Sequence, residues 1–352
     1  MPEVQDPAAT RLAEHTTLRL GGPARRFVRA TTDDELVAAV TAADDAGEPL
    51  LLLGGGSNLV VADEGFAGTV VQVATRGITA DVDDGEVSCG GALVTVAAGE
   101  PWDDVVAHAV ARDWAGIEAL SGIPGSTGAT PVQNVGAYGQ EVAQTIAQVR
   151  TWDRHDRALR TFAGADCGFA YRWSRFKAEP DRYVVVSVTF QLRAASLGGP
   201  VAYAELARTL GVEQGQRAPI AQVREAVLGL RAGKGMVLDA ADHDTWSAGS
   251  FFTNPVLAAE QVPDGAPAYP QPDGTVKTSA AWLIDHAGFA KGYAVTSDAA
   301  ASLSTKHTLA LTNRGGARTA DLLALARAVR DGVRERYGVE LVNEPVLVGC
   351  SL

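Results

Sequence analysis

Three polar residues of this 352-residue chain stand in surroundings that could support chemistry, and the first is a serine. Ser250 lies in SAGSFFTNP, between a glycine and two phenylalanines, and could act as a nucleophile, a proton donor or a cap. No serine lies in a GxSxG motif, and no histidine stands in a recognisable triad order, so a serine hydrolase is disfavoured. The spacing alone favours a cap at the end of a helix or turn.

An arginine and a glutamate are the other two candidates. Arg172 lies in FAYRWSRFK, where aromatic and cationic side chains interleave, and the simplest interpretation is a half-buried strand with cation–π contacts. Glu344 lies in the otherwise apolar VELVNEPVLVG, where an inward carboxylate would be desolvated unless it were paired. Pro345 favours a strand edge or a strand start, so Glu344 is either an exposed edge residue or a site group.

Two glycine-rich segments could cradle a polar ligand. GGGSN, residues 54–58, follows an apolar strand, and its glycines allow backbone amides to point into one concavity, as a pyrophosphate requires. It is neither a Walker loop nor GxGxxG, and on turn chemistry alone a tight turn is the commoner interpretation. GIPGSTGATPVQNVGAYG, residues 122–139, is either a packed surface loop or a backbone-lined groove. Two such loops in one chain favour the groove.

Composition excludes several classes of protein. Apolar residues make up 46% of the chain and the formal net charge is −12, which indicates a globular fold without a broad surface for nucleic acid. No apolar run reaches the ~18–20 residues that span a bilayer, and the N-terminus lacks a signal-peptide pattern, so we expect a cytoplasmic protein. Three distant cysteines (Cys89, Cys167 and Cys350) and scattered histidines without HExxH predict neither disulfides nor a metal site.

Alternating hydrophobic patterns predict the elements that must position these residues. Thr32 begins TDDE, a capping box, and the helix that follows it should end at Gly47. The other expected elements are strands at 25–30 and 49–61, short strands from 68 onward, a helix at 102–114, a connection at 194–200, helices at 220–234 and from 321 to Gly338, and a final strand at 339–349.

Five motifs, in this order, resemble those of the UDP-N-acetylenolpyruvoylglucosamine reductase (MurB) family, the flavoenzymes of bacterial peptidoglycan synthesis. Together they span nearly the whole chain, and their order makes the resemblance specific. They are GGGSNLVV, SGIPGSTGATPVQNVGAYGQE, YRWSRFK, AGSFFTNP and NEPVLVG.

The resemblance implies an α+β protein with an FAD-binding fold of the PCMH or vanillyl-alcohol-oxidase type. Two α/β subdomains would bind FAD, and a separate α+β domain would bind the substrate. The expected limits are 1–67 for the first subdomain, joined by 339–352, then 68–200 for the second subdomain and 201–338 for the substrate domain.

The same resemblance implies that NADPH reduces FAD and that the reduced flavin transfers hydride to the enolpyruvyl double bond, giving UDP-N-acetylmuramate. The partners would be UDP-N-acetylenolpyruvoylglucosamine and NADPH, bound by a monomer with no nucleic-acid or membrane partner. Residues expected to contact FAD are Gly54, Gly55, Gly56, Ser57, Asn58, Gly122, Gly125, Ser126, Gly128, Asn134 and Gly136.

Each catalytic role also follows from the resemblance. Hydride addition leaves negative charge on the carbon beside the substrate carboxylate, so the site must hold that carboxylate and deliver a proton. Arg172 would grip the carboxylate with its planar donor fork, and Ser250 would donate the proton. Glu344 would stabilise the same end, a role that calls for a raised pKa. We expect the glycine before Ser250 and the phenylalanines after it to form a close-packed wall that fixes its direction.

The residues expected to bind the substrate are Tyr203, Lys234, Arg231, Asn254 and Tyr138. Segment 201–210 resembles the tyrosine-bearing loop of the longer of two family types, with Tyr203 as its tyrosine. The stretch between Lys234 and Ser250 is longer and less proline-rich than in that type, and STKHTLALTN, residues 304–313, differs in its polar residues.

Two rival functions remain beside the reductase. One is an FAD oxidase or dehydrogenase of the same fold that acts on another substrate, and the other is a non-enzymatic sugar-nucleotide-binding protein. The presence of both Ser250 and Glu344 favours the reductase, because the wider flavin superfamily does not share that pair.

Overall fold

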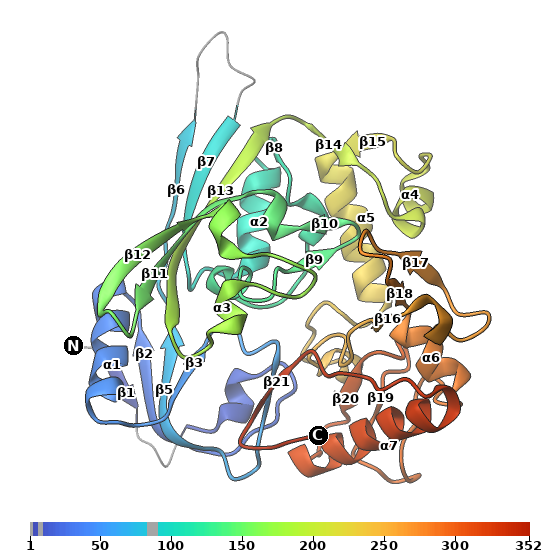
Figure 1. Ribbon diagram of the computed structural model, residues 1–352. Helices are drawn as coiled ribbons and strands as arrows, with labels where there is room; N and C mark the ends of the chain where they lie inside the picture. Colours follow the sequence, from blue (N-terminus) through green and yellow to red (C-terminus); the bar gives the residue numbers. More distant parts are fainter. Residues whose placement is uncertain (1–2, 6–9, 83–90) are drawn as a thin grey trace. The chain divides into compact units, whose positions relative to one another are not determined.

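A computed structural model describes residues 3–5, 10–82 and 91–352 (Figure 1). Residue contacts divide the chain into two compact units, each built from segments that are distant in sequence. The first unit comprises Met1–Asp6, Arg26–Gly55 and Ala67–Ala232, and the second comprises Pro7–Arg25, Gly56–Phe66 and Gly233–Leu352. The three-domain division expected from the sequence stays a prediction.

A four-stranded sheet in the first unit has the order β1-β2-β5-β3. Its strands are β1 (Glu3–Gln5), β2 (Ala24–Ala30), β5 (Phe66–Val73) and β3 (Leu50–Leu53). Helix α1 (Asp33–Asp45) packs on this sheet through Leu36, Ala39 and Val40. Thr32 caps α1 by accepting the N–H of Glu35, whereas the Glu35 carboxylate reaches back to the N–H of Thr31. The N-cap at Thr32 is therefore confirmed, whereas the Glu35 carboxylate bonds to the N–H of Thr31, one residue before the N-cap.

A six-stranded sheet whose strand pairs are antiparallel forms the largest part of the first unit. Its strands, in order, are β12 (Ala158–Ala163), β11 (Ile146–Asp153), β13 (Tyr183–Ala194), β7 (Gly91–Ala97) and β6 (Ile78–Val82), with β8 (Trp114–Ala115) also paired to β13. Helix α2 (Trp102–Val110) buries one face against it, and Trp102 packs on Phe190. The helix expected over 102–114 ends early because Asp113 adopts a φ of 54° and the chain then enters β8.

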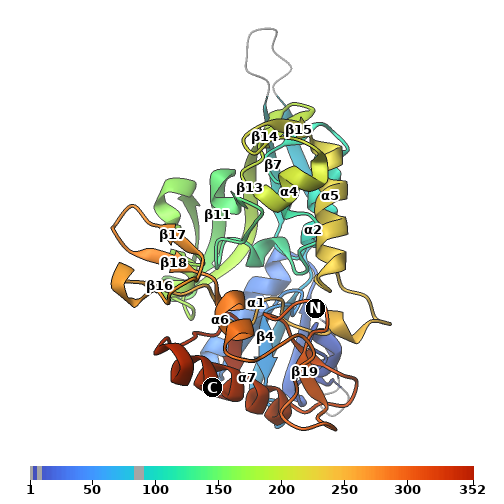
Figure 2. The ribbon, with the colours of Figure 1, turned by 90° about the vertical axis from the view of Figure 1, so that its right-hand side faces the viewer.

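Several further elements complete the first unit. They are β9 (Gly136–Ala137), β10 (Gln140–Glu141), α3 (Arg175–Ala178), β14 (Leu197–Pro200), α4 (Ala204–Leu210), β15 (Arg217–Pro219) and α5 (Ile220–Gly233). The expected connection at 194–200 was wrong in part, because β14 pairs there with β15. Segment 201–210 is mostly helix α4 rather than loop. Helices α2 and α5 lie side by side (Figures 1 and 2), joined by the Arg224–Asp103 ion pair.

In the second unit, α7 (Thr319–Tyr337) packs against α6 (Ala280–His286), β19 (Ala301–Leu303) and β20 (Leu311–Asn313) (Figure 1). Gly338 ends α7 with a φ of 68°, as the sequence predicts. The remaining strands are β4 (Leu59–Val61), β16 (Val256–Leu257), β17 (Ala268–Pro270), β18 (Val276–Thr278) and β21 (Val346–Val348). β21 pairs in parallel with β4.

The expected strand over 339–349 was wrong for its first half, because only residues 346–348 are a strand. Short 3-10 helices occur at Leu12–His15, Glu118–Leu120, Thr127–Ala129, Val142–Gln144, Gly164–Cys167, His243–Thr245 and Ala259–Gln261. The start of the strand expected from EVSCGG, with Cys89, lies outside the described residues.

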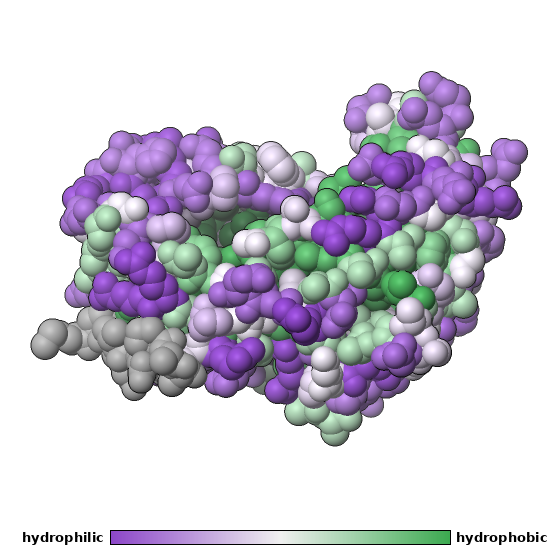
Figure 3. Space-filling model, turned by 90° about the horizontal axis from the view of Figure 1, so that it is seen from below, coloured by the Kyte–Doolittle hydropathy of each residue, from purple (hydrophilic) through white to green (hydrophobic). Residues whose placement is uncertain are grey.

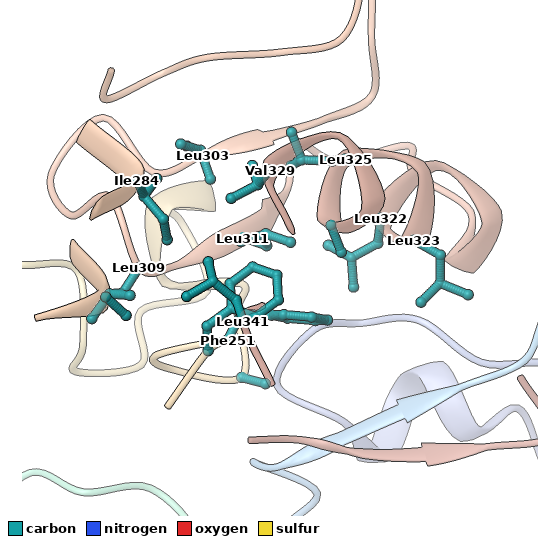
Figure 4. Packing of buried hydrophobic residues seen from close by; sticks show 14 of the residues in the cluster. Phe251, Ile284, Leu303, Leu309, Leu311, Leu322, Leu323, Leu325, Val329 and Leu341 are labelled. Atoms are coloured by element: carbon teal, nitrogen blue, oxygen red, sulfur yellow. The ribbon is translucent and has the colours of Figure 1, made fainter. Parts of the chain in front are cut away.

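The second unit has one large hydrophobic core. Leu322, Leu325 and Val329 of α7 belong to the same buried cluster as Leu311 and Phe251, which Figure 4 shows from close by. Within the described ranges, no helix combines the length and the apolar character needed to cross a bilayer. The face of the molecule in Figure 3 carries broad hydrophilic patches with hydrophobic residues between them.

Candidate active site

The two glycine-rich segments of the first unit meet backbone to backbone. A Cβ atom added to Gly55 would lie 2.6 Å from the Cα of Gly125, and one added to Gly54 would lie 2.3 Å from the Ser126 hydroxyl oxygen. In the described part of the chain, the amides of Gly54, Gly55 and Gly125 donate to no other residue. A side-chain-free wall with available N–H groups fits a pyrophosphate, so this region fits the cofactor that the sequence predicts.

Other glycines of the second segment serve packing. The N–H of Gly122 donates to the Asp103 carboxylate at 2.6 Å, and the N–H of Gly128 donates to the Ala98 carbonyl at 2.8 Å. Because their N–H groups already donate to protein acceptors, any contact of Gly122 or Gly128 with a cofactor would have to use the Cα or the carbonyl group. Asn134 is 1% exposed, and its amide bridges Glu141 and the Ala170 carbonyl. Asn134 therefore holds the segment in shape through its side chain.

Arg172 stands in a strained turn rather than in the expected strand. Residues 170–173 form a tight turn, in which Arg172 has a φ of 52°. Its guanidinium donates to the Gly136 carbonyl at 2.7 Å and to the Asn134 carbonyl at 3.4 Å. The expected cation–π contacts do occur, since Arg172 lies 5.4 Å from the centre of the Tyr171 ring. Arg172 is thus joined to the second glycine-rich segment.

Three of the residues predicted to bind the substrate gather in the first unit. Tyr138 and Tyr203 meet edge to face with ring centres 5.7 Å apart. Tyr203 precedes α4 and is 52% exposed, which leaves much of its ring available for contacts. Arg231 of α5 is 9% exposed. Burial lowers the pKa of Arg231, while Tyr138 and Asp103 act in the opposite direction. Arg231 therefore interacts electrostatically with Tyr138, which in turn contacts Tyr203.

The second unit contains the remaining residues of GGGSN. A Cβ on Gly56 would lie 1.8 Å from the His15 carbonyl oxygen, so only glycine fits there. Asn58 accepts the N–H of Val346 at its carbonyl, and its side-chain amide donates to the Glu344 carbonyl at 3.4 Å. GGGSN is therefore connected through Asn58 to the segment that carries Glu344.

Ser250 and Glu344 lie on adjacent segments of the second unit. The N–H of Glu344 donates to the Phe251 carbonyl at 2.8 Å, and the N–H of Thr253 donates to the Val342 carbonyl at 3.0 Å. Ser250 caps no helix, so the helix-cap interpretation of the spacing was wrong. Its hydroxyl makes no hydrogen bond to any residue that the structure describes. That hydroxyl is consequently available to a ligand.

The surroundings of Ser250 confirm one half of the expected wall. Phe251 and Phe252 are each 1% exposed, with ring centres 5.1 Å apart, and both belong to the core cluster of this unit. Figure 4 shows Phe251 within that cluster. The expectation for Gly249 was wrong, because a Cβ there would meet no atom within 4 Å. Gly249 instead has a φ of 71°, a conformation that L side chains rarely adopt. The phenylalanines fix the segment and the glycine turns it.

Two further predicted residues lie in the second unit. Lys234 directly follows α5. Asn254 accepts the N–H of Ala280 at its side-chain oxygen, beside the Ser279 cap of α6. That oxygen is committed to the fold, so a substrate contact of Asn254 would use its NH₂ group. The structure thus brings together Ser250 and Glu344 in one unit, and Tyr138, Tyr203 and Arg231 in the other.

Reasoning from the sequence missed one supporting residue of the Arg172 turn. The ammonium of Lys177 donates to the Arg172 carbonyl at 3.0 Å and lies 6.0 Å from the centre of the Trp173 ring. Both residues belong to FAYRWSRFK, so the interleaved cations and aromatics were the available signal. The turn geometry that joins them could not be inferred, because a non-glycine residue with positive φ is rare.

Comparisons with known proteins agree along the chain. A family model described as "FAD binding domain" matches residues 24–161, and one described as "UDP-N-acetylenolpyruvoylglucosamine reductase, C-terminal domain" matches residues 241–348. The UDP-N-acetylenolpyruvoylglucosamine reductase of Cutibacterium acnes is 64% identical over 97% of this chain and 90% of its own length. That of Streptomyces avermitilis is 57% identical over 97% and 94%.

A solved structure supports the same assignment. The crystal structure of UDP-N-acetylenolpyruvylglucosamine reductase (MurB) from Thermus caldophilus covers 99% of both chains, with a TM-score of 0.63 and 25% identity. The expected α+β, FAD-binding fold is confirmed by this likeness and by the FAD-binding match. The chain belongs to the UDP-N-acetylenolpyruvoylglucosamine reductase family and is an FAD-dependent oxidoreductase.

Proposed function

We propose that this protein uses NADPH to reduce the enolpyruvyl double bond of UDP-N-acetylenolpyruvoylglucosamine, giving UDP-N-acetylmuramate for peptidoglycan synthesis. The observation that carries the proposal is the backbone hydrogen bond that sets Glu344 beside the segment of Ser250. The names of the relatives support UDP-N-acetylenolpyruvoylglucosamine as the substrate, and the match to an FAD-binding domain supports FAD as the cofactor. We also propose that the protein is a cytoplasmic monomer and that it belongs to the longer of the two family types, the one with a tyrosine-bearing loop.

FAD, when bound, supplies hydride transfer between the nicotinamide and the substrate. The wall formed by Gly54, Gly55 and Gly125 would hold its pyrophosphate through N–H groups. Such a wall suits this purpose because two backbones in contact leave no space for side chains that would keep the phosphates away.

Arg172 would hold the carboxylate of the enolpyruvyl group. Hydride addition to the methylene carbon places negative charge on the neighbouring carbon, and the carboxylate shares that charge. A planar guanidinium stabilises such a group with two parallel hydrogen bonds. The bonds from Arg172 to the carbonyls of Gly136 and Asn134 support this role, since they restrict the orientation of the guanidinium before a ligand binds.

Ser250 would donate its hydroxyl proton to that neighbouring carbon and regain a proton from solvent afterwards. A serine hydroxyl is a weak acid, so it can act only toward a strongly basic carbon and with a cation nearby. We assign the cation to Lys234. Glu344 would act on the carboxylate end of the substrate, and its backbone bond to Phe251 keeps it next to the serine segment.

The remaining residues would recognise the nucleotide sugar. Tyr203 would close over the UDP portion, a role supported by its half-exposed ring and its edge contact with Tyr138. Arg231 and the NH₂ group of Asn254 would provide further polar contacts.

The purified protein tests this function directly. It should show a flavin absorbance spectrum that NADPH bleaches without oxygen and that UDP-N-acetylenolpyruvoylglucosamine restores. UDP-N-acetylglucosamine, which lacks the enolpyruvyl group, should leave the flavin reduced. A protein that binds no flavin, or whose reduced flavin is not reoxidised by the enolpyruvyl substrate, would contradict the proposal. Reoxidation by a different substrate would instead support an oxidase or dehydrogenase of the same fold.

A further inference from the structure

Two segments of the second unit have no role in the function proposed above. One is the stretch between Lys234 and Ser250, which contains DHDTW, and the other is STKHTLALTN, residues 304–313. The structure joins these two segments through a buried carboxylate, Asp244, which is 4% exposed.

Every part of the Asp244 carboxylate has a partner in the second segment or directly beyond it. One oxygen accepts the N–H of Thr305 at 2.9 Å and the guanidinium of Arg314 at 2.7 Å, and the other accepts the Thr305 hydroxyl. A buried charge is tolerated only when it is paired and hydrogen-bonded in this way. Hydrogen bonds of this kind, with ionised partners, are short and directional. Asp244 therefore fixes the position of its own segment against residues 305–314.

The same two segments are joined again on the C-terminal side of Asp244. The N–H of Asn313 donates to the Trp246 carbonyl at 3.0 Å, and the N–H of Phe251 donates to the Leu309 carbonyl at 2.8 Å. Ser250 thus lies on a span that is fastened to residues 304–314 at both of its ends. The end near Asp244 is held by charged side chains, since Arg314 pairs with Asp244 and Lys306 pairs with Asp242.

Asp244 is also in contact with the turn that follows Lys234. A Cβ added to Gly235 would lie 3.0 Å from the Asp244 carbonyl oxygen, so Gly235 packs closely on the Asp244 backbone. A shift of Asp244 would be transmitted to the residues after Lys234 as well as to the span of Ser250. Asp244 therefore contacts the turn after Lys234, the proposed cation, through its backbone, and holds the span of Ser250, the proposed proton donor, through its carboxylate.

We propose that Asp244 is a positioning residue, which directs the Ser250 hydroxyl at the substrate by fixing the Ser250 span to Thr305 and Arg314. The inference rests on the role proposed for Ser250. Loss of a carboxylate that only stabilises the fold would not slow flavin reoxidation more than flavin reduction. Asp153 of the first unit provides that comparison, because it is 0% exposed and pairs with Arg182.

The test follows flavin reduction by NADPH and flavin reoxidation by UDP-N-acetylenolpyruvoylglucosamine separately, by rapid mixing of the purified holoenzyme. Asp244→Asn keeps the side-chain shape but removes the charge that holds Arg314. Reoxidation should slow about 10- to 100-fold, because a displacement of the order of 1 Å is enough for such a loss. Reduction by NADPH and the flavin content should stay at the wild-type level. Thr305→Val, which removes only the hydroxyl donor, should produce a smaller loss of the same kind and provides the readout if Asp244→Asn does not fold.

A double variant decides whether Asp244 acts through Ser250. In the Ser250→Ala background, Asp244→Asn (or Thr305→Val) should slow reoxidation no further, since the group to be positioned is absent. The control Asp153→Asn should lower the melting temperature without separating the two half-reactions. Additive losses in the double variant, or equal slowing of both half-reactions by Asp244→Asn, would overturn the inference. Normal reoxidation in Ser250→Ala alone would instead refute the proposed role of Ser250.

Discussion

The backbone N–H of Glu344 donates a 2.8 Å hydrogen bond to the carbonyl of Phe251, the residue after Ser250. This bond sets a hydroxyl that makes no hydrogen bond to any described residue next to a segment that carries a carboxylate, although the two lie far apart in sequence. Because Phe251 is buried and Asn58 holds the Glu344 carbonyl, both segments are fixed by groups other than the two side chains. The Ser250 hydroxyl, which bonds to none of the described residues, is consequently left for a ligand.

The contact between the two glycine-rich segments predicts the effect of Gly55→Ala. The added methyl would lie 2.6 Å from the Cα of Gly125, so the loops must separate, at a cost of about 1–3 kcal/mol. The protein should purify with reduced flavin content and a lower melting temperature, measured by absorbance and thermal unfolding. Gly229→Ala in α5 is the matched control, because its Cβ would meet no atom within 4 Å and alanine favours helix. Full flavin content in Gly55→Ala would contradict this account of the wall.

Tyr203→Ala should weaken substrate binding with little effect on stability. Tyr203 is 52% exposed and contacts Tyr138, so its loss should raise the KM for the UDP-linked substrate by about tenfold, the order of magnitude for one aromatic contact. Steady-state kinetics and thermal unfolding measure the two effects. Tyr269→Ala is the control, because Tyr269 is 53% exposed and lies on β17 of the second unit. An unchanged KM in Tyr203→Ala would remove Tyr203 from the substrate site.

Asp153 predicts a pH-dependent part of the stability. Burial would raise its pKa, but hydrogen bonds from Arg182 and from the Asp156 N–H overcome this and hold the pKa below its ordinary value. A carboxylate with a lowered folded-state pKa stabilises the protein above the unfolded-state value, ~3.9, and this contribution is lost as pH falls through the folded-state pKa.

Asp153→Asn should therefore lower the free energy of unfolding by about 2–4 kcal/mol at neutral pH. The difference from the wild type should shrink as the pH falls below about 4, as measured by urea unfolding. Asp33→Asn, which breaks the exposed pair with Arg150, should cost only about 0–1 kcal/mol. A difference for Asp153→Asn that stays constant down to low pH would refute the assignment.

Local signals in the sequence predicted the elements that depend on neighbouring residues. Thr32 and Glu35 mark the start of α1, and Gly338 marks the end of α7, because caps and left-handed turns act within a few residues. The motif around Ser250 led to the predicted site because it resembles a contiguous motif of the family, and the roles of its residues stay a prediction.

Long-range pairing explains what the sequence could not predict. Residues 339–345 have the composition of a strand, but Val342 and Glu344 bond to the irregular segment around Phe251 and Thr253 instead. The turn of Arg172 is stabilised by carbonyls of Asn134 and Gly136, which are distant in sequence. Tertiary contacts of this kind override local preference.

The proposed proton transfer is tested most directly by the two half-reactions of Ser250→Ala. The hydroxyl is needed only after hydride reaches the substrate, so flavin reduction by NADPH should proceed as in the wild type. Reoxidation by UDP-N-acetylenolpyruvoylglucosamine should slow by about 10²- to 10⁴-fold, the usual contribution of a positioned acid. Rapid-mixing absorbance at the flavin band measures both rates. Unchanged reoxidation, or an equal loss in both half-reactions, would contradict the role of Ser250 as proton donor.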